Sequence, residues 1–268
     1  MKTTRLDEEQ IAIFRRDGYL KYSQPVLAEA QFSALRDHFE VKLQEHEARG
    51  ERPEAMDKPH FTDTKLFDWV LSDILLDLVE PLLGPDFNLF STHFICKPQG
   101  DGRRVPWHED SAYWKGMLDP MEAVTVWLAI DPSTIVNGCM SVVPRSHTTQ
   151  QAGFSDYHNV DAEKAVFPTE IVRAQQRAES SVPLELDPNQ ASLHDAHLIH
   201  GSAPNTSSIR RCGFTMRFVP SHVRLAPKWE NQILLYPARG RDKAGNNLAD
   251  PTKTYPHLLE AARGRGVH

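Results

Sequence analysis

The sequence predicts a mainly β protein with helices: a jelly-roll (double-stranded β-helix) core with a helical layer packed on one sheet. Apolar residues follow a helical spacing as far as residue 85, and the period then changes to two. Eight short candidate strands follow, separated by turn residues such as those at 98–100. Many short strands after a helical layer are typical of a jelly roll with helices on one face.

The 268 residues are expected to form a single domain, because all-β barrels commonly use roughly 200–250 residues as one unit. Residues 1–85 would form the helical layer and residues 86–236 the jelly-roll core, with a C-terminal tail at 237–268. Residues 148–181 have little strand character and would form a lid-like insertion. We expect this insertion and the loop at 49–64 to border the mouth of the pocket.

Three helices are expected before the core. Asp7 can cap the first, and Gly84-Pro85 stops the third. Charged residues, Gly50 and two prolines indicate that the segment after the second helix is a solvated loop. The expected helices cover residues 7–16, 27–48 and 64–83, with a short strand at 19–22. The expected core strands cover residues 88–97, 105–111, 123–130, 138–143, 182–186, 191–194, 211–219 and 232–236.

The strand at 211–219 has one apolar face and one mixed face, because alternate side chains of a strand point the same way. Cys212, Phe214, Met216 and Phe218 form the apolar face; Arg211, Gly213, Thr215 and Arg217 form the mixed one. The strand at 123–130 divides similarly and places Trp127 on its mixed face. The helices would cover the apolar faces. The barrel would then enclose a cavity containing arginines, and a buried arginine needs an anionic partner.

Composition excludes several classes of function. The net charge of −6 without a basic stripe argues against a nucleic-acid partner. No apolar run has the length of a membrane span, and the N-terminus lacks the apolar region of a signal peptide. The three cysteines are far apart in sequence, so neither a disulfide framework nor a zinc knuckle is expected. A cytoplasmic protein with reduced thiols and a small-molecule partner is the resulting expectation.

His108-Glu109-Asp110 is the strongest candidate for chemistry. If the segment is a strand, His108 and Asp110 share a face and provide two ligands of a metal site. Two histidines and one carboxylate with open metal positions are the arrangement of non-haem Fe(II) oxygenases. The residues alone leave four candidates for the third ligand: His194, His197, His200 and His222.

Three ordered motifs resemble the phytanoyl-CoA dioxygenase family of Fe(II)- and 2-oxoglutarate-dependent oxygenases. They are Trp107-His108-Glu109-Asp110, the Asn-Gly-Cys stretch at 137–147, and His200-Gly201-Ser202 followed by Asn205 and Arg211. The second motif departs from the family pattern at Arg145, where the family usually has glycine. The presence of Asp110 resembles the hydroxylating members, because halogenating relatives have a small residue there.

The resemblance implies that His108, Asp110 and His200 bind Fe(II). It also implies residues for the cosubstrate 2-oxoglutarate: Arg211 with Ser202 at its distal carboxylate, and Trp127 and Lys97 beside it. With O2, the family reaction converts 2-oxoglutarate to succinate and CO2 and hydroxylates an unactivated C–H bond. The alternatives are a cupin-like isomerase or hydrolase that does not use 2-oxoglutarate, and a barrel that binds without catalysis.

Four further residues are candidates for contact with a small-molecule substrate. Tyr113 and Trp114 directly follow the metal-binding segment, so one of them would line the substrate pocket. Strand parity turns Arg217 and His93 into the barrel, where the sequence offers them no obvious partner. Either a protein carboxylate neutralises Arg217, or the substrate brings the anion.

Overall fold

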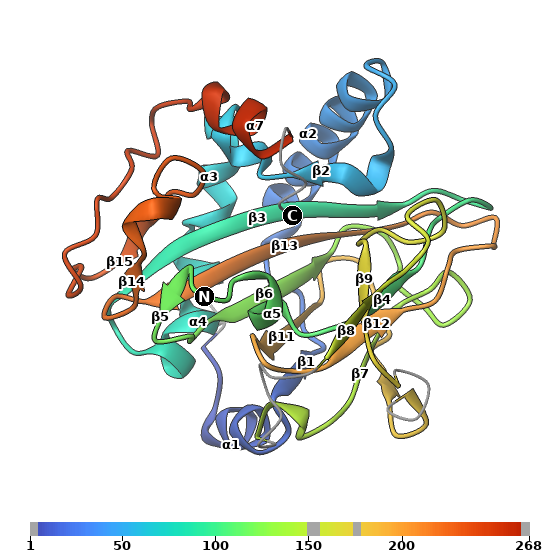
Figure 1. Ribbon diagram of the computed structural model, residues 1–268, viewed down its shortest axis with the longest axis horizontal. Helices are drawn as coiled ribbons and strands as arrows, with labels where there is room; N and C mark the ends of the chain where they lie inside the picture. The colour runs from blue at the N-terminus through green and yellow to red at the C-terminus, as the bar shows by residue number, and fades with distance from the viewer. Residues whose placement is uncertain (1–4, 149–155, 174–177, 264–268) are drawn as a thin grey trace.

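Two antiparallel sheets form the centre of the computed structural model, which describes residues 5–148, 156–173 and 178–263. The larger sheet has the order β1-β11-β6-β13-β3-β15, with β2 paired to β3; the smaller has the order β10-β7-β12-β4 (Figure 1). Helices cover one face of the larger sheet, whose other face looks toward the smaller one. The predicted jelly roll with a helical layer is confirmed.

The described helices are α1 (Glu8–Asp17), α2 (Glu29–Glu47), α3 (Phe67–Val70), α4 (Asp73–Leu83), α5 (Asp110–Tyr113) and α7 (Pro256–Arg263). The strands of the larger sheet are β1 (Tyr19–Tyr22), β2 (Met56–Asp57), β3 (Phe87–Lys97), β6 (Val124–Ala129), β11 (Ala191–Asp195), β13 (Arg211–Pro220) and β15 (Tyr236–Arg239). Those of the smaller sheet are β4 (Val105–His108), β7 (Met140–Val142), β10 (Val182–Pro183) and β12 (His200–Ser202). Two two-stranded antiparallel pairs complete the described fold: β5 (Leu118–Asp119) with β14 (Arg224–Leu225), and β8 (Tyr157–Asn159) with β9 (Thr169–Ile171).

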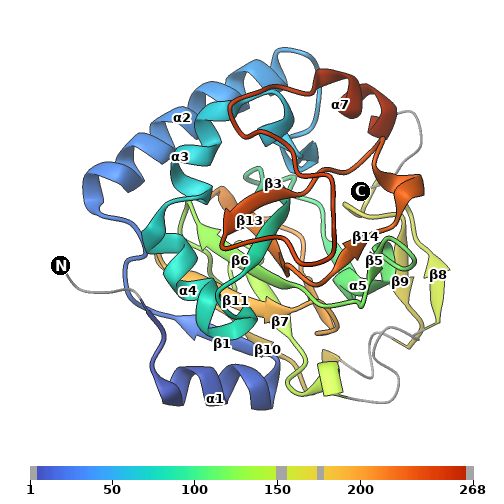
Figure 2. The ribbon, with the colours of Figure 1, turned by 90° about the vertical axis from the view of Figure 1, so that its left-hand side faces the viewer.

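The main apolar core lies between the helices and the larger sheet. Figure 2 shows α2, α3 and α4 side by side over strands of that sheet. Phe39 of α2 packs on Phe94 of β3, and Phe94 stacks on Phe214 of β13 with ring centroids 4.0 Å apart. The apolar face predicted for β13 belongs to this core. The mixed face therefore points into the barrel, as strand parity required.

Several element boundaries differ from the prediction. The helix expected at 64–83 is broken, because Ser72 is extended (φ −68°, ψ 140°) and separates α3 from α4. The strand expected at 105–111 ends at His108, and the chain turns into α5. The strand expected at 232–236 begins only at Tyr236, and the tail contains the unpredicted α7. The three-residue strand β12 was too short to produce an alternating pattern.

The loop at 49–64 is not the solvated segment that its charge suggested. His60 is fully buried against Phe61, Phe67 and Tyr236. Burial lowers the pKa of His60 to about 3, so the ring is neutral, and its Nδ1 lies 2.6 Å from Thr92 Oγ1. The same loop adds β2 to the edge of the larger sheet. No helix in the described residues is long and apolar enough to cross a membrane.

Gly213 is required by the close approach of Trp127 on the neighbouring strand. A Cβ at this position would lie 2.0 Å from Trp127 Cζ2, so Gly213→Ala should displace the indole and destabilise the fold by roughly 1–3 kcal/mol. Denaturant unfolding measures this loss. Combining Gly213→Ala with Trp127→Leu should recover part of it, because the smaller side chain relieves the overlap. Additive losses in the double variant would contradict this account.

Candidate active site

Three buried side chains bring their ligand atoms together inside the barrel. One donor atom each of His108, Asp110 and His200 lies within 4.8 Å of the others. His108 ends β4 and is directly opposite His200 on β12. Asp110 arrives by another route, because it opens the short helix α5 instead of continuing the strand. The prediction that His108 and Asp110 share one face of one strand is therefore wrong, although the two side chains do converge.

Both histidines are held in the tautomer that metal binding needs. Nδ1 of His108 donates to the carbonyl of Pro106 at 2.7 Å, and Nδ1 of His200 donates to the carbonyl of Leu198 at 2.9 Å. The proton is on Nδ1 because a carbonyl oxygen can only accept, which leaves the Nε2 lone pair free for a metal. Burial, followed by the neighbouring His108, lowers the pKa of His200 well below its usual value, so the ring stays neutral.

Asp110 presents one oxygen to the histidines and the other to hydrogen-bond donors. Its Oδ1 lies 3.7 Å from His108 Nε2. Its Oδ2 accepts from Thr125 Oγ1 at 3.1 Å and Arg217 Nε at 3.5 Å, and lies 3.7 Å from His194 Nε2. Burial alone would raise the pKa of Asp110, but the Arg217 guanidinium holds it well below the usual value. The carboxylate is thus ionised and turned so that Oδ1 is free for a metal.

A cavity adjoins the histidines of the triad, and two buried cations meet at Ser202 in its wall. Arg211 donates to the carbonyl of Gly138 at 2.9 Å and to Ser202 Oγ at 3.2 Å, but its Nη1 has no partner among the described residues. Lys97 Nζ lies 2.6 Å from Ser202 Oγ and also bonds the Ala203 carbonyl. Neither cation has a carboxylate partner in the described chain. Burial lowers the pKa of Arg211 to about 10 and that of Lys97 well below its usual value.

The triad and the cavity beside it fit Fe(II) and 2-oxoglutarate, the two groups that the family resemblance implied. A buried guanidinium nitrogen without a partner requires an anion, and a planar carboxylate matches the fork geometry of the group. The Trp127 ring lies 5.2 Å from the Arg211 guanidinium carbon and forms a wall of the same cavity. The donor set of two neutral imidazoles and one carboxylate suits Fe(II). The structure therefore brings together all seven residues predicted to bind the metal and cosubstrate.

The other candidate histidines have different surroundings. His197 is paired with Asp195 at 3.3 Å, and His222 with Glu122 at 3.1 Å near the surface. His194 is buried in the cosubstrate cavity, yet it lies outside the three-residue ligand group. His194 lies on the face of β11 that points into the barrel, which places it beside Asp110. The alternation of side chains along β11 could have predicted this position.

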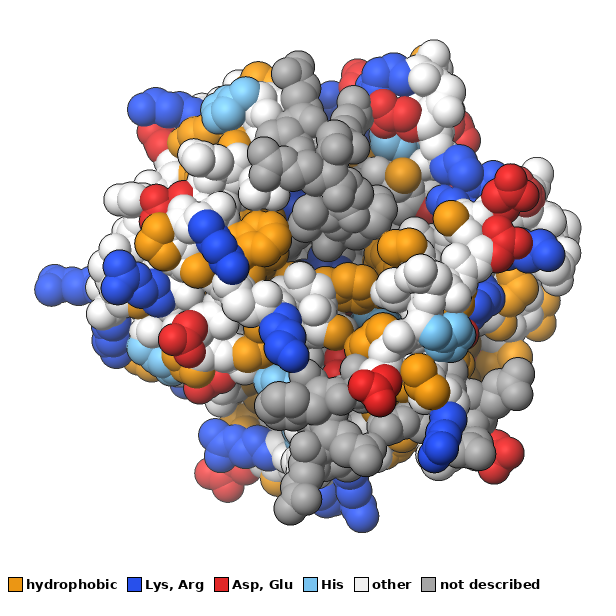
Figure 3. Space-filling model, viewed as in Figure 1, with side chains coloured by type: hydrophobic (Ala, Val, Ile, Leu, Met, Phe, Trp, Pro, Cys, Tyr) orange, Lys and Arg blue, Asp and Glu red, His pale blue; other side chains and the backbone are white. Residues whose placement is uncertain are grey.

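A recess on the far side of Asp110 is the candidate substrate site. Tyr113 and Trp114 both line it, as does Phe167 from the insertion. Asp57 and Lys58 of the loop at 49–64 also line this recess. Figure 3 shows the face of the molecule seen in Figure 1, with hydrophobic side chains gathered near its middle.

The sequence left open whether a protein carboxylate or the substrate neutralises Arg217, and the structure contains such a carboxylate. Arg217 is paired with Asp110, the carboxylate of the metal triad. His93 Nε2 donates to the Glu54 carbonyl at 2.9 Å, and its Nδ1 lies 3.7 Å from Asp57 Oδ1. Sequence reasoning also missed Asp57 and Lys58, which line the recess. The charged loop at 49–64 gave no signal that distinguished them from solvated residues.

Comparison with known proteins supports this reading of the site. The profile of the phytanoyl-CoA dioxygenase (PhyH) family matches residues 14–213. A probable alpha-ketoglutarate-dependent hypophosphite dioxygenase of Stutzerimonas stutzeri is 28% identical over 58% of this chain and 53% of its own length. An L-proline trans-4-hydroxylase of Streptomyces griseoviridis is 30% identical over 52% of this chain and 56% of its own. The chain spans about half the length of the curated relatives it matches.

The solved structure of the non-heme monooxygenase ThoJ, without bound ligand, has the same fold. It is 25% identical, with a TM-score of 0.74 and coverage of 96% of this chain and 95% of the other. The family match covers more than half of the chain and includes the His108, Asp110 and His200 positions. The chain therefore belongs to the phytanoyl-CoA dioxygenase family of dioxygenases, whose cofactors are Fe(II), 2-oxoglutarate and O2.

Proposed function

We propose that this protein is an Fe(II)- and 2-oxoglutarate-dependent dioxygenase that hydroxylates an unactivated C–H bond of a small anionic molecule, releasing succinate and CO2. One observation supports it most directly: a single cavity is lined by both histidines of the metal triad and by Arg211, whose buried Nη1 has no partner in the described chain. A cupin-like isomerase or hydrolase that does not use 2-oxoglutarate would not need this guanidinium.

Separate groups of residues would bind the metal and the cosubstrate. His108, Asp110 and His200 would hold Fe(II), which supplies O2 activation and C–H oxidation when bound together with 2-oxoglutarate. Arg211 and Ser202 would orient the distal carboxylate of 2-oxoglutarate through charge-assisted hydrogen bonds. Lys97 bonds Ser202 Oγ and so adds positive charge at the same end of the cavity.

The cavity walls would exclude water from the reacting atoms. Apolar side chains line the cosubstrate cavity on several sides: Ile95, Val105, Trp127, Met140 and Phe167. Charge interactions strengthen where water is excluded, which favours tight orientation of the dicarboxylate. Arg217 and Thr125 would keep Asp110 in one orientation through its Oδ2, so that the ligand geometry is fixed before substrate arrives.

The recess beyond Asp110 has a lining typical of a small-molecule site, with aromatic and apolar walls and a few charged groups. It meets the cosubstrate cavity at Arg217 and Phe167. The names of two relatives indicate substrates with an anionic group, hypophosphite and L-proline. These features support a compact substrate that reaches the metal past Arg217.

A substrate screen tests the proposal. The purified protein, loaded with Fe(II) and 2-oxoglutarate under air, should form succinate faster with its true substrate, and the product should gain one oxygen atom by mass spectrometry. Asp110→Ala is the matched control, because it removes one ligand and should abolish both readouts. Product formation without 2-oxoglutarate, or failure to bind 2-oxoglutarate at all, would reject this function.

A further inference from the structure

The substrate recess contains a lysine that no motif indicated. Lys58 follows β2 and is only 4% exposed, although lysine is almost never buried without a reason. Its Nζ bonds Asp57 Oδ2, and both residues line the recess together with Arg217. The recess thus combines two cations with Asp57 and the metal ligand Asp110.

The backbone of Lys58 is held in an unfavourable conformation. Its φ of 49° lies in the left-handed region, which costs energy for a residue other than glycine, asparagine or aspartate. The backbone N–H nevertheless bonds the Thr92 carbonyl of β3 at 2.9 Å, so the conformation is fixed by the sheet edge. Residues kept in such conformations cluster at ligand-binding sites. The strain therefore points to a role for this ammonium group in the recess.

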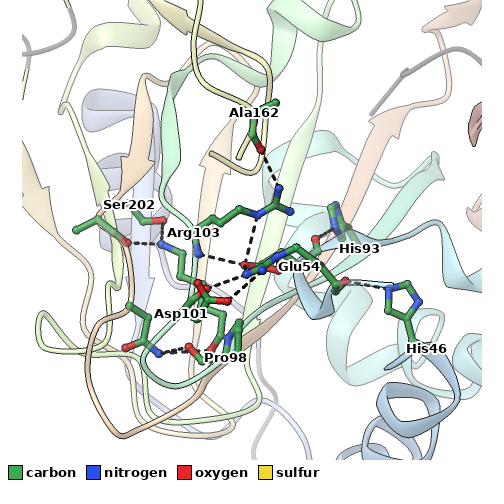
Figure 4. A network of polar contacts seen from close by, with 12 residues as sticks. His46, Glu54, His93, Pro98, Asp101, Arg103, Ala162 and Ser202 are labelled. Carbon is green, nitrogen blue, oxygen red and sulfur yellow. Dashed lines mark hydrogen bonds and ion pairs between the residues drawn. The ribbon is translucent and has the colours of Figure 1, made fainter. Parts of the chain in front are cut away.

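A buried carboxylate anchors the segment that carries Lys58. Figure 4 shows Glu54 at the centre of a polar network, contacted by Arg52 and Arg103. Glu54 is fully buried, and its carbonyl accepts from His93 on β3. Arg103 also donates to the Ala162 carbonyl of the insertion at 3.1 Å. The loop is thus tied to the sheet on one side and to the insertion on the other, which makes the Asp57–Lys58 corner a preformed wall.

Two cations and two carboxylates line the recess, and one of the cations keeps a free edge. Lys58 is offset by Asp57, whose pKa is lowered to about 2: burial alone would raise it, but Lys58 and His93 overcome that effect. Arg217 bonds Asp110 only through its Nε. No acceptor for its terminal amino groups lies in the described parts of the chain.

We propose that Lys58 and Arg217 together bind the anionic group of the substrate, a carboxylate or a phosphorus oxyanion. Asp57 would orient the ammonium group of Lys58, and Arg217 would use its terminal amino groups while its Nε stays on Asp110. The apolar part of the substrate would pack on Trp114, over whose ring Arg217 also lies, and on Phe90. This inference rests on the proposed function and specifies its substrate class.

The test uses the full chain, loaded without oxygen with Fe(II) and saturating 2-oxoglutarate. The probes are small carboxylic acids, each with its uncharged primary amide, together with hypophosphite and phosphite as the phosphorus arm. Binding is followed by calorimetry and by the visible absorption of the iron–2-oxoglutarate complex, which should respond because Arg217 touches Asp110. We expect the acids or the oxyanions to bind and the amides not to bind; which arm binds identifies the anion.

Variants at position 58 make the result specific. Lys58→Asn removes the ammonium group yet tolerates the left-handed backbone, and should weaken binding of the anionic probe about tenfold or more. Lys58→Arg should retain most of the affinity, and Lys65→Met at an exposed site should retain all of it. Equal binding of acids and amides, unchanged affinity in Lys58→Asn, or no anion bound from either arm would each overturn the proposal. The proposed function is judged separately, by 2-oxoglutarate binding and succinate formation in the same preparations.

Discussion

Replacement of either His108 or His200 by alanine is expected to abolish stoichiometric Fe(II) binding. Each ring would supply one of the three protein ligands that the described residues bring together, and a backbone hydrogen bond at Nδ1 orients each ring. The remaining histidine cannot replace the lost ligand, because it offers a metal only its Nε2. Its Nδ1–H is already bonded to a backbone carbonyl. Metal analysis after anaerobic loading and desalting would show one iron per wild-type chain and none per variant.

Two other histidines provide controls for this result. His197→Ala and His222→Ala should each retain one iron, since both rings are paired with carboxylates outside the triad. His194 gives the sharper comparison, because it is buried 3.7 Å from Asp110 Oδ2 but belongs to no ligand group. Retained iron in His200→Ala together with lost iron in His194→Ala would show that the wrong histidine was assigned.

Much of the fold could be predicted because burial leaves a periodic trace. The alternation in β13 identified which side chains face the helices and which face the cavity, and both faces are as expected. Long, strongly periodic segments such as α2 and β3 were found with nearly correct bounds. Short elements leave no such trace: β12 has three residues, and only the motif resemblance, not the pattern, selected its ligand His200.

The candidate site shows the limit of strand parity more clearly. The prediction placed His108 and Asp110 on one face of one strand, yet the backbone turns at Glu109 and Asp110 belongs to α5. The Asp110 carboxylate does lie beside His108, as strand parity predicted, but a helical turn places it there and not a continuing strand. The loop at 49–64 was mispredicted because its composition is polar, whereas Glu54 and His60 are buried by tertiary contacts that local sequence does not encode.

The sequence could not decide which anion neutralises Arg217, a protein carboxylate or the substrate. A buried guanidinium does need an anion, and here Asp110 provides it for one edge of the group. The sequence could not reveal that this carboxylate also serves a metal, because the two residues are far apart along the chain. Only the three-dimensional arrangement shows that one edge of Arg217 is engaged while the other faces the recess.

Arg211→Ala is expected to weaken 2-oxoglutarate binding by roughly two orders of magnitude or more, because losing one partner of a buried charge pair costs roughly 3–5 kcal/mol. The variant should not unfold the protein. In the absence of the cosubstrate, Arg211 is a buried cation without a carboxylate partner in the described chain, so its removal relieves a desolvation cost. Anaerobic calorimetry with 2-oxoglutarate and thermal unfolding of the same samples measure the two effects.

Arg210→Ala is the matched control, one residue earlier on the opposite side of the strand. Its guanidinium bonds both Asp131 and Glu40, and these two carboxylates raise its pKa above the usual value. Removing it should lower the free energy of unfolding by on the order of 1 kcal/mol and leave 2-oxoglutarate affinity unchanged. The two variants should therefore behave in opposite ways. Arg211→Ala should lose 2-oxoglutarate affinity without losing stability, and Arg210→Ala should lose stability without losing affinity. Unchanged 2-oxoglutarate affinity in Arg211→Ala would show that Arg211 does not bind the cosubstrate and would point to Arg217, which lines the same cavity.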